Sequence, residues 1–152
     1  MKVECPCCET KFDPVEAPSK PRSFQQHKRY FKLCKLAFDH WPHGYYFQPV
    51  DEIEARKFLQ VLAHYGKVKA IFPLSGVRKD IAISIATVAI RAVDATGFPV
   101  IRENDLRIVV PDSISYAKLK HLAFCELNDK VEAEIEKLIG VSCEQLLTEK
   151  AA

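Results

Sequence analysis

The sequence predicts an α+β fold: a mainly helical single domain with a small antiparallel β-hairpin and a short Cys-rich N-terminal extension. Three observations favour this fold class. Apolar residues recur at helical spacing in several long segments, and two short strand-like segments flank a tight polar turn. A proline-containing linker separates the first cysteines from the rest of the chain. We therefore divide the chain into an extension, residues 1–19, and one globular domain, residues 20–152.

Length and composition are those of a globular protein. The chain has 152 residues, of which 48% are hydrophobic and 28% are charged, so it can bury a core. No apolar stretch reaches the roughly 20 residues that span a bilayer. No signal-peptide pattern opens the chain, and we therefore expect a soluble, cytoplasmic protein.

The extension contains a candidate zinc knuckle. Cys5 and Cys8 stand in C-x-x-C spacing, which allows two thiolates to bind one zinc ion. Tetrahedral zinc needs four ligands, and His40 with His43 has the H-x-x-H spacing that could complete the site. The other candidate ligands are Cys7, Cys34, Cys125, Cys143, His27 and His64. The alternative is a reduced, partly ordered tail without metal, because six unevenly spaced cysteines do not indicate a disulfide framework.

A helix is predicted within residues 20–41, beginning at Ser23, which can form a capping box with Gln26. At about 100° per residue, its side chains separate by type. One continuous arc is apolar: Phe24, His27, Tyr30, Phe31, Cys34, Ala37, Phe38 and Trp41. The other side is polar and mostly basic: Gln25, Lys28, Arg29, Lys32 and Lys35, with Asp39 as its only acid. Leu33 and Leu36 fall outside the apolar arc and require a second contact.

A second helix is predicted from about Asp51 to Tyr65. Asp51 and Glu54 form a capping box at its start, and Gly66 is a suitable C′ residue for ending it. The side chains expected in the core are Ile53, Phe58, Leu59 and Leu62, with Val61 as a further candidate.

The next segments predict a strand, a helix and a β-hairpin. Residues 67–74 alternate as a strand does. Residues 81–93 fit both a helix and a strand, and their length and their alanines favour the helix. Residues 98–102 and 106–110 form the hairpin around the polar turn at 103–105.

Two helices are predicted at the C-terminal end of the chain. The first begins at Ser113 or Ser115, continues to about Ile139 and ends at Gly140. The second is short and begins with a capping box of Ser142 and Gln145.

The motifs do not indicate an enzyme. The chain has no nucleotide-binding loop, no G-x-S-x-G motif and no H-E-x-x-H motif. Cys34 and His27 could be imagined as a nucleophile pair, but both fall on the apolar arc, where we expect an inert thiol and a core histidine. Asp80, Glu103 and Asp105 are interpreted as cap and turn residues rather than metal ligands. A metal-dependent nuclease is the remaining enzymatic alternative.

The basic side of the first helix is the candidate functional site. Three lysines align there at i, i+4 and i+7 beside two arginines, and residues 20–35 contain no acid. Such a row matches a phosphate backbone and gains affinity by releasing counterions. The candidate nucleic-acid-binding residues are Arg22, Gln25, Lys28, Arg29, Lys32 and Lys35. Tyr30, Tyr45 and Tyr46 could stack on unpaired bases, or they complete the core beside a merely solvated basic face.

Residues 22–41 resemble NinB, also called Orf, a family of lambdoid phage recombination mediators. The matching positions are Arg22, Ser23, Gln26, Lys28, Phe31 and Cys34. The segment is also similar to a related group of uncharacterised phage proteins, through His27, Lys28, Arg29, Tyr30, Phe31, Phe38 and Trp41. A second similar patch covers residues 111–118. The resemblance extends over residues 20–140, except for the poorly matched stretch 67–96.

The resemblance implies a homodimeric phage accessory protein that acts in recombination or replication in the host cytoplasm, without catalysis. Such a protein would bind single-stranded DNA and help to load the host recombinase or handle the host single-strand-binding protein. The C-x-x-C extension is not part of the NinB pattern. The alternative is a phage protein-binding module that engages an acidic host protein of defence or replication through the same basic face.

Overall fold

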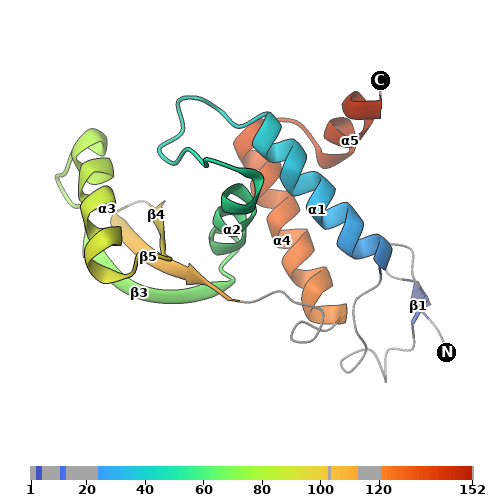
Figure 1. Cartoon of the computed structure of the whole chain (residues 1–152), viewed down its shortest axis with the longest axis horizontal. Helices are drawn as coiled ribbons and strands as arrows, with labels where there is room; N and C mark the ends of the chain where they lie inside the picture. The colour runs from blue at the N-terminus through green and yellow to red at the C-terminus, as the bar shows by residue number, and fades with distance from the viewer. Residues whose placement is uncertain (1–2, 5–10, 13–23, 103, 113–120, 152) are drawn as a thin grey trace.

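The computed structural model describes residues 3–4, 11–12, 24–102, 104–112 and 121–151, which form a mainly helical α+β fold (Figure 1). The elements are β1 (Val3–Glu4), β2 (Lys11–Phe12), α1 (Phe24–Asp39), α2 (Glu52–Leu62), β3 (Gly66–Pro73), α3 (Lys79–Val93), β4 (Phe98–Arg102), β5 (Asp105–Pro111), α4 (His121–Ile139) and α5 (Cys143–Ala151). The predicted fold class is confirmed. Within the described residues, no helix is both long and apolar enough to cross a membrane.

The main sheet has the strand order β3-β5-β4, and both pairings are antiparallel. β4 and β5 form the predicted hairpin, in which Phe98 lies opposite Val109 and Arg102 opposite Asp105. β3, which the sequence predicts only as a separate strand, pairs with the other edge of β5. The strand that is last in the chain is therefore the central strand of the sheet.

Two hydrophobic cores lie on opposite faces of this sheet. On β5, Leu106 packs with Ala82 and Ala86 of α3, whereas Val109 belongs to the larger core. This alternation follows the period of two along a strand. The larger core joins the sheet to the helical part of the molecule, and its fully buried large side chains are Tyr30, Leu33, Leu36, Phe58, Leu59, Phe124, Ile135 and Leu146. The helix predicted over residues 81–93 is confirmed as α3.

α1 is turned about its axis relative to the predicted orientation. Leu33 and Leu36, which fall outside the predicted apolar arc, are each only 1% exposed. Phe31 and Phe38, which lie within that arc, are half-buried at the edge of the core. The reason is that α1 contacts α2, α4 and α5, so that its buried face is set by three neighbouring helices.

Two predictions for α2 are wrong. Ile53, expected in the core, is 53% exposed. The helix ends at Leu62, and His64 rather than Gly66 adopts a positive φ of 64°. Gly66 instead begins β3, where an added Cβ would lie 2.6 Å from the carbonyl oxygen of Val110, so close strand approach explains this glycine. The other core residues predicted for α2 are buried: Phe58, Leu59, Val61 and Leu62.

The helix caps of α2 and α5 are confirmed. Oδ1 of Asp51 accepts a hydrogen bond from the backbone N of Glu54 at 2.8 Å. Oγ of Ser142 accepts from the backbone N of Gln145, and Oε1 of Gln145 accepts from the backbone N of Ser142, both at 3.1 Å. The predicted cap residues outside the described part of the chain are Ser23, Ser113 and Ser115.

Candidate nucleic-acid interface

Three lysines form an exposed strip along α1. Lys28, Lys32 and Lys35 are all exposed, and their spacing places them on successive turns of the same helix face. Asp39 continues this face at the end of the helix. A basic face is therefore present on α1. Its exposed cations among the described side chains are these three lysines, whereas the sequence assigned five side chains to it.

A groove of about 610 Å³ lies between α1 and α2, beside this strip. α1 contributes Lys32 and Lys35 to its lining, and α2 contributes Arg56. One acid, Glu52, also lines the groove, so that its lining has three cations and one anion. The net positive charge favours an anionic ligand. The remaining lining side chains are apolar or neutral: Phe31, Cys34 and Ile53.

Arg56 is held over the ring of Phe31. Its Cζ lies 5.0 Å from the ring centroid, which is a cation–π contact. The Phe31 ring also contacts His27, with centroids 4.5 Å apart, and Tyr30, with centroids 5.4 Å apart. The groove therefore has an aromatic wall and a guanidinium whose position is fixed by packing.

The sequence did not predict that Arg56 and Ile53 belong to this site. Both lie on α2, 18 and 21 residues after Lys35, and they reach the groove because α2 packs alongside α1. Their spacing of three residues places them on neighbouring turns of one helix, and this spacing is the only sequence pattern that connects them. The spacing does not show which other helix the two side chains face.

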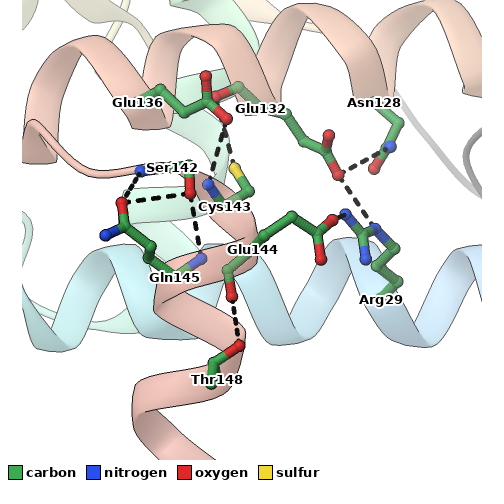
Figure 2. Close-up of polar contacts among 9 residues, drawn as sticks. All are labelled: Arg29, Asn128, Glu132, Glu136, Ser142, Cys143, Glu144, Gln145 and Thr148. Carbon is green, nitrogen blue, oxygen red and sulfur yellow. Dashed lines mark hydrogen bonds and ion pairs between the residues drawn. The ribbon is translucent and has the colours of Figure 1, made fainter.

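Arg29 has a different environment from the lysines (Figure 2). Its Nε lies 3.1 Å from Oε1 of Glu132 on α4, and its Nη2 lies 3.0 Å from Oε1 of Glu144 on α5. Burial lowers the pKa of Arg29, but hydrogen bonds and charges from Glu144 and Glu132 outweigh this effect and raise the pKa above its usual value. Arg29 thus connects three helices, and its donors point toward carboxylates rather than toward the groove.

The same cluster fixes the start of α5 (Figure 2). Oε1 of Glu136 accepts a hydrogen bond from the backbone N of Cys143 at 3.1 Å, and the Cys143 thiol donates to the backbone oxygen of Glu132. Nδ2 of Asn128 donates to Oε1 of Glu132 at 3.4 Å. We interpret this group as structural, because the Arg29 guanidinium and the carboxylates of Glu132, Glu136 and Glu144 bond to groups within the protein.

The remaining predicted DNA-binding residues lie partly or wholly outside the described residues. Arg22 is not described, and for Gln25 only the backbone, in the first turn of α1, is described. Among the tyrosines, Tyr30 is 1% exposed and packs edge-on against Phe124, so it cannot stack on a base. Tyr45 and Tyr46 are half-buried against the larger core.

The metal prediction is not tested by the described residues. Cys5 and Cys8 lie outside them. His40 and His43, the pair proposed to complete the site, follow the C-terminal end of α1, and both are exposed. No group of three or more metal-ligating side chains occurs in the part of the chain that is described.

The thiol of Cys34 is an inert core group. It is 2% exposed, and burial raises its pKa to about 12. A thiol in this state is not a nucleophile near neutral pH, in agreement with the prediction made from the apolar arc.

Comparison of the chain with protein-family models, with curated proteins and with solved structures finds no significant match. The likeness to NinB therefore stays a prediction made from its motif residues. The groove and the lysine strip are the features of the described residues that bear on function.

Proposed function

We propose that the protein is a nonenzymatic DNA-binding protein that holds single-stranded DNA in the groove between α1 and α2. One observation carries the proposal: the groove combines three cations with an exposed apolar side chain, Ile53, and the half-buried ring of Phe31. Lys32, Lys35 and Arg56 are placed to contact phosphates, and Phe31 with Ile53 offers a surface for a base. Lys28, one turn further along α1, extends the phosphate contact beyond the groove.

The apolar part of the groove favours single strands over duplex. Ile53 is 53% exposed beside the half-buried ring of Phe31. In duplex DNA the faces of the bases are stacked on one another, whereas in a single strand they can pack on apolar and aromatic side chains. Phosphate contacts alone would not distinguish the two forms.

The biological part of the proposal rests on the resemblance to NinB. We propose an accessory role in phage recombination or replication, in which the bound strand is passed to a host recombinase or shared with a host single-strand-binding protein. Zinc at Cys5 and Cys8 remains a prediction that this role does not require.

Fluorescence anisotropy with labelled single-stranded and duplex oligonucleotides over a salt series tests DNA binding. We expect the single strand to bind more tightly than the duplex. For each phosphate contact, the logarithm of the binding constant should fall by about 0.7 per unit of log salt concentration. Three or four contacts therefore predict a slope of about −2 to −3. Charge reversal of Lys32 and Lys35 to Glu should abolish binding. The matched control reverses Lys67 and Lys69, which are exposed on β3 away from the groove. Equal losses in both double variants, or a flat salt response, would contradict the proposal.

A protein ligand is the second candidate, and the exposure of Ile53 favours it. An acidic peptide with an apolar anchor residue would satisfy the cations and cover this side chain at the same time. Pull-down from host lysate after nuclease treatment distinguishes the candidates. The peptide would be favoured if the wild type still captured a host protein after nuclease treatment, the variant with Lys32 and Lys35 reversed did not, and neither oligonucleotide bound.

A further inference from the structure

α3 has apolar residues on two faces, but only one of these faces is covered. Ala82, Ala86 and Ala89 are buried on the side toward the sheet. The sequence has no charged residue from Ile81 to Ile90. A helix that is apolar on both sides is normally buried on both sides.

The second face forms an open strip. Val88 is 69% exposed and Ile81 is 44% exposed, and Ala92 is exposed. Ile85 is half-buried, because part of its side chain packs against the smaller core under α3. α3 lies at one end of the molecule, with the sheet on one side and no other labelled element beyond it (Figure 1). We call these four residues the α3 strip.

The spacing of the α3 strip is that of a helix-pairing seam. Its members follow one another at intervals of four, three and four residues, the pattern of the a and d positions of a coiled coil. The neighbouring hydroxyl groups tolerate burial, because Ser84 donates to the backbone oxygen of Asp80 and Thr87 donates to that of Ile83. These two hydroxyl groups would therefore keep a hydrogen bond if pairing excluded water from them.

We propose that the α3 strip binds the α3 strip of a second copy of this chain, with the two helices antiparallel around a twofold axis. The intervals of four, three and four are the same in both directions, so an antiparallel pair is self-complementary. In this register Ile85 contacts the partner's Val88, and Ile81 contacts the partner's Ala92. A large side chain thus meets a smaller one at each layer.

The charges at the two ends of α3 favour the antiparallel orientation. Arg78 precedes the helix, is largely exposed and forms a surface ion pair with Asp80 at 3.2 Å, while Asp94 follows the helix. The pKa of Asp94 is lowered by hydrogen bonds from Thr96, which keeps this carboxylate charged. Antiparallel pairing brings Arg78 toward the partner's Asp94, whereas parallel pairing would bring like charges together.

This pairing goes beyond the proposed DNA binding and does not depend on it. The α1–α2 groove is lined by other elements, and α3 lies on the far side of the sheet from α1 (Figure 1). A dimer would therefore present two open grooves. The seam has only four layers, so we expect association that depends on concentration.

Sedimentation velocity of the full chain over a wide concentration range tests the pairing. We expect a mass that rises from 17.3 kDa toward twice this value. Val88→Asp should keep the protein monomeric at every concentration, because it places a charge at the centre of the seam. The matched control is Val50→Asp, which adds the same charge at a residue that is 80% exposed and not on α3. A wild-type monomer at every concentration, or a dimer that Val88→Asp does not weaken, would overturn the proposal.

A second variant tests the orientation. Ile81→Glu alone should weaken the dimer, and Ile81→Glu combined with Ala92→Lys should restore it, since each Glu then lies opposite the partner's introduced Lys. In a parallel pair the same double variant would place like charges opposite each other and would weaken the dimer further, which would refute the antiparallel arrangement. Circular dichroism of each variant checks that the helical content is unchanged.

Discussion

Nε of Arg29 on α1 donates a hydrogen bond to Oε1 of Glu132 on α4 at 3.1 Å, which removes this guanidinium from the basic face that its helix position predicts. The lysines on the same helix are exposed. Cations that are close in sequence therefore have two different environments, one between helices beside acids and one on the exposed face of α1.

Replacement of Arg29 by Met should lower the free energy of unfolding by about 1–3 kcal/mol, because it removes charge-assisted hydrogen bonds in a half-buried site. Urea denaturation measures this change. The control is Lys32→Met, which should shift the stability by less than about 0.5 kcal/mol because the side chain is exposed. Affinity for single-stranded DNA should show the opposite order, with Lys32→Met weakening it and Arg29→Met leaving it unchanged at a temperature where the variant is folded. Equal loss of affinity in both variants would place Arg29 in the interface after all.

Replacement of Arg56 by Met should reduce affinity for single-stranded DNA about fivefold to tenfold, and should reduce the salt slope by about 0.7, the value for one phosphate contact. Lys57→Met is the matched control. Lys57 is the next residue of α2 and is exposed, whereas Arg56 is half-buried, and Lys57 lines a different pocket, together with Phe98 and Thr96. Anisotropy titrations at several salt concentrations measure both quantities. An unchanged slope for Arg56→Met would show that Arg56 does not contact phosphate.

Stability should fall as the pH rises above about 9. Burial raises the pKa of Cys34 and of Cys143 to about 12, while an ordinary thiol ionises near 9.0. Between these values the unfolded chain has released protons that the folded chain retains, so unfolding becomes more favourable with increasing pH. Burial also raises the pKa of Tyr46, which acts in the same direction.

Urea denaturation from pH 7 to pH 10.5 measures this dependence, with a maximum slope of about 1.4 kcal/mol per pH unit for each thiol. The double variant Cys34→Ala with Cys143→Ala should begin from lower stability and lose less of it with increasing pH. A slope equal to that of the wild type would show that the two thiols are not protected from ionisation in the folded state.

Replacement of Gly66 by Ala should destabilise the sheet by about 1–3 kcal/mol, because the new Cβ would overlap the strand beside it. The contacts are 2.6 Å to the carbonyl oxygen of Val110 and 2.9 Å to a methyl group of Val109. Gly44→Ala is the control, since no atom lies within 4 Å of the Cβ position at Gly44. Thermal unfolding compares the two variants, and equal melting temperatures would contradict the predicted overlap.

Local patterns in the sequence were sufficient for most of the secondary structure. The caps at Asp51 and Ser142 have side chains whose partners are three residues away, so their hydrogen bonds depend on nothing distant. The β4–β5 hairpin likewise follows from a short polar turn between two apolar segments. The lysine strip of α1 follows from the helix period alone.

Tertiary packing decided which of these residues share a site. The orientation of α1 depends on three helices that contact it, so the burial of Leu33 and Leu36 could not be derived from one helix alone. The side chain of Arg29 is directed away from the basic face because Glu132 on α4 and Glu144 on α5 form ion pairs with it.

By itself, the sequence determined the α+β fold class, the helix caps, the hairpin and the existence of a row of lysines, because each depends on residues that are neighbours in the chain. Only the tertiary structure decided that Arg56 and Ile53 join Lys32 and Lys35 around one groove, and that one apolar face of α3 remains uncovered. The physical reason is that a side chain's burial and charge partners depend on which elements pack beside it, and the local period of a helix carries no information about that.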